Sequence, residues 1–395
     1  MSRFLFVVPP FVGHVNPLVG VAAELLTRGH EVAWAGPAAV VGPLVGGSGR
    51  VFDCASPPAA ELQRPPDVNG FAALEFLWER VLVPLADAMV AGVAAAAETF
   101  RPDVLVVDQQ ALAGAVVAHR TGLAWATVAS TSAELADPLG GLPKVDGWLR
   151  GLMRELQERH QDPRLGADLR FSPIQVLVFS TADLVGPEVP ADLPLRFVGP
   201  STGARPAGPA FPWHLLDPRR SMVLVTLGTA NAEAGRRFLG ECVTAVRDRA
   251  DRVQAVVVDP DGTLPETADV IVAPRVPQLT LLDRATAVIC HAGHNTVCET
   301  LASGLPLVLA PIRDDQPVIA DQVVRAGAGV RLRFNRAAAP HIGRALDAVL
   351  DDPAYRTNAE RLRESFRSAG GPPAAARHLE LLAVGQTAGR QDVPR

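Results

Sequence analysis

The sequence predicts an α/β protein made of two doubly wound units, each with a parallel sheet covered by helices. Short apolar runs alternate with amphipathic segments, which is typical of strands buried on both faces and of the helices that cover them. The alternation stops at a proline-rich stretch near residue 200 and then restarts. With 395 residues, the chain is long enough to form two packed cores.

The first unit opens on the apolar run 4–10, which predicts a central parallel strand. Asn16 is a favourable N-cap and Pro17 a favourable first helical residue. Gly29 stands where helices commonly end in a left-handed residue. We therefore expect a helix that begins after Asn16 and a second strand at 31–35.

The rest of the first unit continues the alternation. Strands are predicted at 104–107, 124–129 and 175–179, with an apolar helix at 111–120. The Ala-rich segment 85–97 contains a charged residue and a glycine and predicts a packed helix. Since no apolar stretch reaches the roughly 18 residues that a membrane-spanning helix needs, we expect no membrane span.

The stretch 200–220 holds several prolines and no helical periodicity, which predicts an interdomain linker. Six apolar runs follow it, and each predicts a strand: MVLVTLGT, VQAVVVDP, DVIVAP, TAVICHAG, PLVLAPI and GVRLRF. The expected division is an N-terminal domain at 1–199, the linker, a C-terminal domain at 221–372, and a final helix with a tail at 373–395. Neither unit has a G-x-G-x-x-G motif after its first strand, which disfavours an NAD or FAD enzyme.

Composition excludes several classes of protein. Lys plus Arg number 37 against 42 Asp plus Glu, a net charge of −5, and no basic cluster suggests a nucleic-acid partner. The first apolar run ends at two prolines without a cleavage site, so a secretory signal is not expected. The four cysteines form no C-x-x-C pair, which favours a reducing cytoplasm over a disulfide framework. Homodimer formation stays open.

Two polar side chains follow strands of the first unit. His14 comes directly after the first predicted strand, and Asp108 ends the run VLVVD. Because ligands of open α/β sheets bind beyond the carboxyl ends of the strands, His14 is a candidate general base. A carboxylate near it would fix the tautomer of the imidazole. The alternatives are a loop hydrogen bond or helix cap for His14 and an N-cap role for Asp108.

The richest stretch of the second unit is 275–316. A predicted strand ends at Cys290, a small-residue loop containing His291 follows, and a helix begins near Thr296. Free N–H groups at a helix N-terminus bind anions, and a diphosphate is the natural guest. Glu299 in the first turn could accept hydrogen bonds from ribose hydroxyls, or simply complement the helix dipole.

A zinc site is an alternative interpretation of the same stretch. Its ligands would be Cys290, His291, His294 and Cys298. This spacing matches no zinc finger or ribbon, and both cysteines lie among apolar residues. Buried cysteines usually behave as small apolar side chains, so we expect no metal site.

Several motifs together resemble the family 1 glycosyltransferases of GT-B fold, which include bacterial macrolide, antibiotic and carotenoid glycosyltransferases and the plant UDP-glycosyltransferases of secondary metabolism. They are G-H-x-N-P, the strand-end Asp, F-V-G-P, V-T-L-G-T, V-P-Q, H-x-G-x-N-T-x-x-E and P-x-x-x-x-P-x-x-x-D-Q. The similarity extends over essentially the whole chain, and the stretch 275–316 is its specific part.

The resemblance implies roles for individual residues. His14 would remove a proton from an acceptor hydroxyl, and Asp108 would support it. The nucleotide-sugar would contact a set in the second unit: Thr229, Arg275, Val276, Gln278, His291, Gly293, Asn295, Thr296, Glu299, Asp315 and Gln316. The helix around 374–383 would cross back to the first domain.

Within the donor set, Val276 and Gln278 would hold the base and ribose, Glu299 the ribose hydroxyls, and Asp315 with Gln316 the transferred sugar. One residue departs from the family pattern: Arg275 stands where many members have a tryptophan that stacks on the base. A guanidinium plane can also stack on a base. The choice between a UDP-sugar and a dTDP-sugar stays open.

The implied reaction is inverting, metal-independent and without a cofactor, with a hydrophobic small-molecule aglycone as acceptor. Phe76, Trp78 and Trp148 are candidate acceptor contacts, and the alternative for them is helix core. The sequence leaves two alternative functions: a GT-B-type nucleotide-sugar epimerase that needs no acceptor, and a bilobal small-ligand binding protein. The apolar first domain disfavours the epimerase, and no export signal supports the binding protein.

Overall fold

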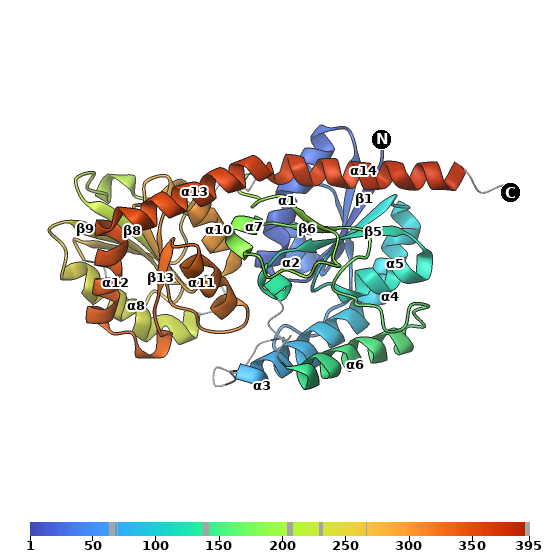
Figure 1. Cartoon of the computed structure of the whole chain (residues 1–395), viewed down its shortest axis with the longest axis horizontal. Coiled ribbons are helices and arrows are strands. Elements are labelled where there is room, and N and C mark those ends of the chain that lie inside the picture. Colours follow the sequence, from blue (N-terminus) through green and yellow to red (C-terminus); the bar gives the residue numbers. More distant parts are fainter. Residues whose placement is uncertain are drawn as a thin grey trace. The chain divides into compact units, whose positions relative to one another are not determined.

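The computed structural model forms two compact units (Figure 1). Unit 1 comprises Met1–Thr181, Glu188–Pro206 and Ala369–Arg395, and unit 2 comprises Ala182–Pro187 and Ala207–Ser368. The structure describes residues 1–62, 68, 70–136, 142–203, 208–228, 232–265 and 267–391.

Within the described residues, unit 1 contains a seven-stranded parallel sheet in the order β3-β2-β1-β4-β5-β6-β7. Its strands are β1 Arg3–Val7, β2 Glu31–Gly36, β3 Arg50–Asp53, β4 Val104–Asp108, β5 Ala124–Ala129, β6 Val176–Val178 and β7 Leu195–Phe197. Its helices are α1 Val12–Thr27, α2 Ala38–Val45, α3 Gly70–Glu75, η1 Phe76–Leu82, α4 Val83–Phe100, α5 Leu112–Thr121, η2 Ala133–Ala136, α6 Pro143–Arg159 and α14 Gly371–Gln391.

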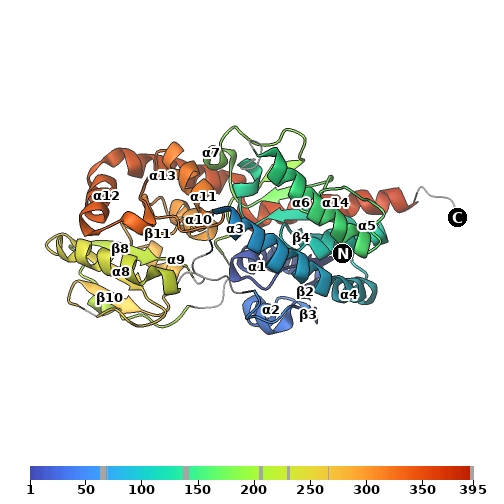
Figure 2. The ribbon, with the colours of Figure 1, turned by 90° about the horizontal axis from the view of Figure 1, so that it is seen from below.

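The central strand β1 shows why this sheet is wound on both faces. Successive side chains of a strand point to opposite faces. Leu5 and Val7 pack into a core with α4 and α5, whereas Phe4 and Phe6 pack into a second core with α1 and α14. Both faces are therefore buried, as the continuous apolar run predicts. Figure 2 shows α6 beside α4 on the first of these faces.

The predicted start of the first helix is wrong. α1 begins at Val12 with Phe11 as its N-cap, and Pro17 lies inside the helix. The N–H groups of His14 and Val15 already bond to the carbonyl of Phe11. Proline is disfavoured but tolerated inside a helix, so the Asn-Pro signal put the start too late. His14 consequently lies in the first turn of α1 and not in a loop before it.

The predicted end of this helix is confirmed. Gly29 has a φ of 81°, and its N–H bonds to the carbonyl of Leu26 while the N–H of His30 bonds to Leu25. A residue with a Cβ adopts this conformation only at a cost, so glycine is the natural choice.

The last helix, α14, belongs to unit 1, as the resemblance implies. It packs against α1, β4 and β5 (Figure 1). Ala375, Ala376 and Leu379 are completely buried in the same core as Phe4 and Phe6. The C-terminal part of the chain therefore completes the core of the first unit.

In the described part of unit 2, a six-stranded parallel sheet has the order β10-β9-β8-β11-β12-β13. Each of the six predicted runs forms a strand: β8 Ser221–Thr226, β9 Val253–Val258, β10 Val270–Ala273, β11 Ala287–Cys290, β12 Leu307–Leu309 and β13 Gly329–Arg331. The helices are α7 Ala182–Val185, η3 Trp213–Leu215, α8 Ala232–Arg247, α9 Gln278–Leu282, α10 His294–Ala302, α11 Gln316–Arg325, η4 Phe334–Arg336, α12 Ala339–Asp351 and α13 Pro353–Ala369.

One continuous helical stretch, Gly70–Phe100, is long and apolar enough to cross a membrane by length and composition alone. The expectation that no such stretch exists was too strict. In the structure 56% of its apolar window is buried, and its side chains form a large part of a unit 1 core. Core helices of folded domains pass the same test, so this is weak evidence for a membrane span.

Candidate active site

His14 and Asp108 meet at the carboxyl edge of the unit 1 sheet. Nδ1 of His14 lies 2.9 Å from Oδ1 of Asp108. The pair forms because Asp108 ends β4, which lies beside β1, and His14 stands in the helix that follows β1. The Asp108 side chain is completely buried, whereas that of His14 is 18% exposed. Their predicted proximity is confirmed.

Asp108 is fixed by its own loop as well. Its Oδ1 also accepts a hydrogen bond from the backbone N–H of Gln110 at 2.9 Å. It is not the N-cap of α5, which is Ala111. Oδ2 is buried and has no hydrogen-bond partner among the described residues. A buried carboxylate with one oxygen committed to the imidazole suits a group that stabilises positive charge on His14.

Ser130 is a third member of this site that the sequence reasoning missed. Its Oγ lies 2.8 Å from Nδ1 of His14, and the residue is 4% exposed. It follows β5, the strand beside β4, so the rule that placed Asp108 at this edge applies to it too. With Nδ1 carrying a proton toward Asp108, Nε2 of His14 keeps its lone pair and can accept a proton.

In unit 2, the predicted phosphate loop lies between β11 and α10, whose N-cap is Gly293. The His291 ring fills the space beside two glycines. A Cβ added at Gly228 would lie 2.8 Å from Cε1 of His291, and one at Gly293 would lie 2.3 Å from Nε2. The two glycines thus leave the space that the ring occupies. Asn295 and Thr296 lie in the first turn of α10.

The backbone is strained in this loop and in the one after β12. Ala292 has a φ of 65° and Asp314 a φ of 57°. Non-glycine residues pay of order 1 kcal/mol for this region, and such strain clusters at functional sites. β11 and β12 are neighbours in the sheet, so both strained residues lie at the same edge. This edge of the sheet is therefore the candidate ligand-binding site of unit 2.

His291 is neutral at pH 7. Burial lowers the pKa of His291 to about 4, and the positive charge of Arg313 acts in the same direction. A hydrogen bond with the backbone of Thr226 acts against this shift. The residue is 8% exposed, and no described group forms a hydrogen bond to its Nδ1. The ring therefore brings no positive charge to this edge of the sheet.

Gln278 and Glu299, the predicted ribose contacts, are brought together. The Nε2 amide of Gln278, at the start of α9, donates a hydrogen bond to Oε2 of Glu299 at 2.6 Å. Glu299 is 3% exposed. Val276 is half-buried and Arg275 exposed just before α9. Thr229 lies outside the described residues.

Gln316 has a structural duty besides the predicted one. Its Oε1 accepts hydrogen bonds from the backbone N–H groups of Ile312 at 2.8 Å and Arg313 at 3.1 Å. Asp315 is the N-cap of α11. The side-chain oxygen of Gln316 thus shapes the loop after β12, which leaves its NH₂ group as the part suited to a sugar hydroxyl.

The four residues of the zinc alternative are used differently. Nε2 of His294 lies 3.6 Å from Sγ of Cys298, and both side chains are buried. Burial raises the pKa of the Cys290 thiol to about 12, whereas zinc ligands are thiolates. In the part of the chain that the structure describes, no three His, Cys, Asp or Glu side chains are grouped to hold a metal ion.

The candidate acceptor residues differ in exposure. Trp78 is 3% exposed and belongs to a unit 1 core, which is the alternative weighed for it. Phe76 and Trp148 are half-buried against that core. The indole N–H of Trp148 donates to Glu79 at 3.0 Å, and its ring lies 5.6 Å from that of Phe71, which is exposed. Phe71 and Trp148 therefore offer an apolar surface that Trp78 does not.

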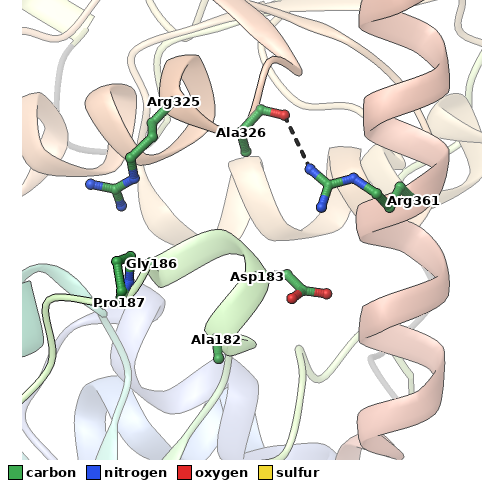
Figure 3. A pocket seen from close by; sticks show the side chains of 7 residues that line it. All are labelled: Ala182, Asp183, Gly186, Pro187, Arg325, Ala326 and Arg361. Atoms are coloured by element: carbon green, nitrogen blue, oxygen red, sulfur yellow. Dashed lines mark hydrogen bonds between the residues drawn. The ribbon is translucent and has the colours of Figure 1, made fainter.

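A cavity of about 440 Å³ in unit 2 contains none of the predicted residues (Figure 3). Its lining is Ala182, Asp183, Gly186, Pro187, Arg325, Ala326 and Arg361. The Arg325 guanidinium donates to the carbonyl of Val185 and lies against Gly186, and Arg361 donates to the carbonyl of Ala326 at 3.4 Å. The arginines thus tie the short α7 segment and α13 to the end of α11.

Known proteins are similar to this chain over most of its length. Residues 249–382 match the family described as erythromycin biosynthesis protein CIII-like, C-terminal domain. The chain is 32% identical over 412 aligned positions to 4'-demethylrebeccamycin synthase of Lentzea aerocolonigenes. That alignment covers 92% of this chain and 96% of the relative.

Solved structures show the same fold. The glycotransferase of kitacinnamycin superposes with a TM-score of 0.78 at 24% identity, over 97% of this chain and 99% of that one. The spinosyn rhamnosyltransferase SpnG complexed with thymidine diphosphate gives a TM-score of 0.73 at 23% identity, over 96% and 100%. These likenesses establish the GT-B fold. The whole-length relative and the family match establish that the chain belongs to the family 1 glycosyltransferases of antibiotic biosynthesis.

Proposed function

We propose that this glycosyltransferase moves a sugar from a uridine or thymidine diphosphate donor to a hydroxyl of a hydrophobic small molecule, with inversion and without a metal ion. The observation that carries the proposal is the pairing of His14 with the buried Asp108 at 2.9 Å. A base of this kind is what direct attack by an alcohol requires.

In the proposed reaction, Nε2 of His14 takes the proton of the acceptor hydroxyl as its oxygen attacks the anomeric carbon. The bond from that carbon to the diphosphate oxygen breaks, and the nucleoside diphosphate leaves with the electron pair. Asp108 stabilises the imidazolium that forms. A single displacement inverts the configuration at the anomeric carbon.

The donor would bind at the strained edge of the unit 2 sheet. N–H groups at the start of α10 and the ring of His291 would meet the diphosphate. Gln278 and Glu299 would meet the ribose, and the NH₂ group of Gln316 the sugar. Hydrogen-bond donors of this kind can stabilise the negative charge of the diphosphate, which a divalent ion does in other enzymes. This supports a metal-independent reaction. The thymidine diphosphate bound to the spinosyn enzyme supports this class of nucleotide.

The acceptor would contact unit 1 near Phe71 and Trp148. An aromatic pair of which Phe71 is exposed and Trp148 half-buried suits an apolar aglycone better than a sugar. The printed names of the relatives, a demethylrebeccamycin synthase and an erythromycin biosynthesis family, support a secondary metabolite as acceptor.

One experiment separates binding from chemistry. Wild-type protein and the His14→Asn variant are screened by thermal shift against UDP, dTDP and GDP. Both are then assayed for sugar transfer to an apolar aglycone, with a nucleotide-sugar that contains the nucleotide that raised Tm. We expect the same nucleotide to stabilise both proteins, because a ligand of the folded state raises Tm. Transfer should fall at least about 100-fold in the variant. Near-wild-type transfer by His14→Asn would rule out the proposed base.

A further inference from the structure

Ser130 reaches the ring of His14 from a different strand than Asp108 does. β4 lies between β1 and β5, and Asp108 at the end of β4 is in register with Val128 of β5. Ser130 therefore stands two residues beyond the register partner of Asp108, at the same carboxyl edge of the sheet. Its Oγ lies 2.8 Å from Nδ1 of His14, and the residue is 4% exposed.

The backbone that carries Ser130 is held from both sides. The carbonyl of Val128 accepts a hydrogen bond from the N–H of Gln109 at 3.0 Å, next to the end of β4. The carbonyl of Ala129 accepts one from the N–H of Phe179, next to the end of β6, at 3.5 Å. Only one rotatable bond separates this backbone from the hydroxyl oxygen of Ser130. The sheet therefore pre-organises the contact with His14.

The carboxylate of Asp108 decides the direction of the hydrogen bond between Ser130 and His14. Oδ1 of Asp108 also lies 2.9 Å from Nδ1. An ionised oxygen at this distance would repel a lone pair on Nδ1, so Nδ1 carries the proton. The hydroxyl oxygen of Ser130 then accepts, and Nδ1–H is shared between two oxygens.

Two oxygens hold the imidazole more firmly than one. A single hydrogen bond lets the ring turn about the line that joins Nδ1 to Oδ1 of Asp108. The second contact, from another strand, opposes this rotation and fixes the direction in which Nε2 points. A general base must lie within hydrogen-bond reach of the proton that it takes, and a misplacement of about 1 Å can cost about 10²-fold in rate.

We propose that Ser130 is a positioning residue for sugar transfer: its hydroxyl oxygen and Asp108 together hold Nδ1–H of His14, so that Nε2 points at the acceptor hydroxyl. This inference rests on the proposed function, because it assumes that His14 is the base. The contact also stabilises the imidazolium once Nε2 has taken the proton, since a charged ring donates stronger hydrogen bonds. Ser130 itself takes no part in the bonds that form and break.

The kinetic test introduces Ser130→Ala into wild type and into His14→Asn. If the hydroxyl acts through the ring, kcat falls about 10-fold in wild type but changes less than about 2-fold in His14→Asn. The thermal shift given by the nucleotide should stay the same in all four proteins. Equal losses of kcat in the two backgrounds would reveal an independent structural role and overturn the proposal. A raised kcat would overturn it as well, because the hydroxyl would then hold the ring in the unproductive tautomer.

Ser180→Ala is the matched control. Ser180 follows β6, the strand beside β5, and is completely buried. Its Oγ forms no hydrogen bond with any residue that the structure describes. The substitution removes one buried hydroxyl at the same sheet edge without removing a hydrogen bond of His14, so kcat should match wild type. A loss as large as that of Ser130→Ala would mean that this edge tolerates no such change, which would overturn the assignment to Ser130.

A spectrum of the ring tests the contact without catalysis. In protein with ¹⁵N-labelled histidine, the signals of His14 are those that His14→Asn lacks. We expect the Nδ1–H proton of His14 to shift upfield in Ser130→Ala and to stay in place in Ser180→Ala, because only the first variant removes an acceptor. An unchanged signal in Ser130→Ala would overturn the proposal. If wild-type protein transfers no sugar from any nucleotide donor, the proposed function fails, whereas the spectrum still decides whether Ser130 holds the ring.

Discussion

The imidazole of His14 faces two oxygens at one nitrogen, and this fixes what its other nitrogen can do. Asp108 Oδ1 and Ser130 Oγ both lie within 3 Å of Nδ1. A buried carboxylate favours the tautomer with the proton on Nδ1. The ring is thereby prepared to accept a proton at Nε2.

Asp108→Asn tests this arrangement. The amide oxygen can still accept from the N–H of Gln110, so the loop should persist, but the imidazolium loses its counter-charge. We expect kcat to fall by about 10² to 10⁴ with little change in donor affinity. Steady-state kinetics and the thermal shift given by dTDP would measure the two effects.

The chain offers a matched control for that variant. His119 Nδ1 lies 2.8 Å from Asp162 Oδ2, and both side chains are buried in the same unit. Asp162→Asn should lower Tm without a comparable loss of kcat. If both variants lose activity in proportion to stability, Asp108 has no special role in the chemistry.

Gln316 allows its two duties to be separated. Gln316→Glu keeps an oxygen for the N–H groups of Ile312 and Arg313 but removes the NH₂ donor. Gln316→Leu removes both. We expect Gln316→Glu to raise the donor KM about 10-fold with a Tm near that of wild type, and Gln316→Leu to lower Tm as well. An unchanged donor KM in both variants would contradict a sugar contact.

At the scale of elements, most strands were predictable because parallel strands buried on both faces consist of continuous apolar runs. All six runs after the linker form strands. β3 and β7 were not predicted, because Arg50–Asp53 begins and ends with a charged residue and Leu195–Phe197 is very short. Helix starts were harder, because several sites compete: Pro17 fits a first turn, yet lies inside α1.

The same limit applies to the site. The sequence predicted correctly that His14 and Asp108 lie side by side, because each follows or ends a strand and the carboxyl ends of parallel strands lie at the same edge of the sheet. Ser130 was missed because its proximity to His14 depends on β5 lying beside β4 and β4 beside β1. Strand order is a property of the folded sheet and is not written in local spacing.

The element α14 is tied to unit 1 by charge as well as by apolar packing. Glu380 lies 2.9 Å from both Nη1 of Arg28 and Nε2 of His30. Burial alone would raise the pKa of Glu380, but the hydrogen bond from His30 and the charge of Arg28 outweigh it, so the pKa is lowered. The pairing therefore stabilises unit 1 when the carboxylate is ionised.

The lowered pKa of Glu380 predicts how the stability of the protein depends on pH. Because the folded-state pKa of Glu380 is lowered, its contribution is present above the unfolded value of about 4.3 and is lost as pH falls through the folded value. Glu380→Gln should lower stability at pH 7 by about 0.5–1 kcal/mol and have a smaller effect at pH 3. Urea unfolding at both pH values measures this; an equal loss at the two would argue against the ion pair.

At the scale of the whole molecule, the chain passes between the two units more than once. Ala182–Pro187 leaves unit 1 and belongs to unit 2, and α14 returns to unit 1 after unit 2 is complete. The net charge of −5 is compatible with an anionic donor, because backbone N–H groups at the start of α10 are proposed to bind the diphosphate. A globally basic surface is then unnecessary.

Removal of residues 371–395 tests the interdependence of the parts. It would uncover apolar side chains of α1, β4 and β5, against which α14 packs. We expect the truncated protein to aggregate or to bind a hydrophobic dye, while a chain shortened only after Gln391 stays monodisperse. Size-exclusion chromatography of the two would show this; a well-behaved shorter protein would mean that α14 is dispensable.

The return of α14 also bears on how the protein is made. A ribosome releases the residues of β1 and α1 before unit 2, yet the helix that completes their core emerges only after unit 2. Unit 2 lies almost wholly between them and can fold first, although domains usually fold in N-to-C order. Until then, the apolar residues of unit 1 that α14 packs against stay uncovered for the whole synthesis of unit 2.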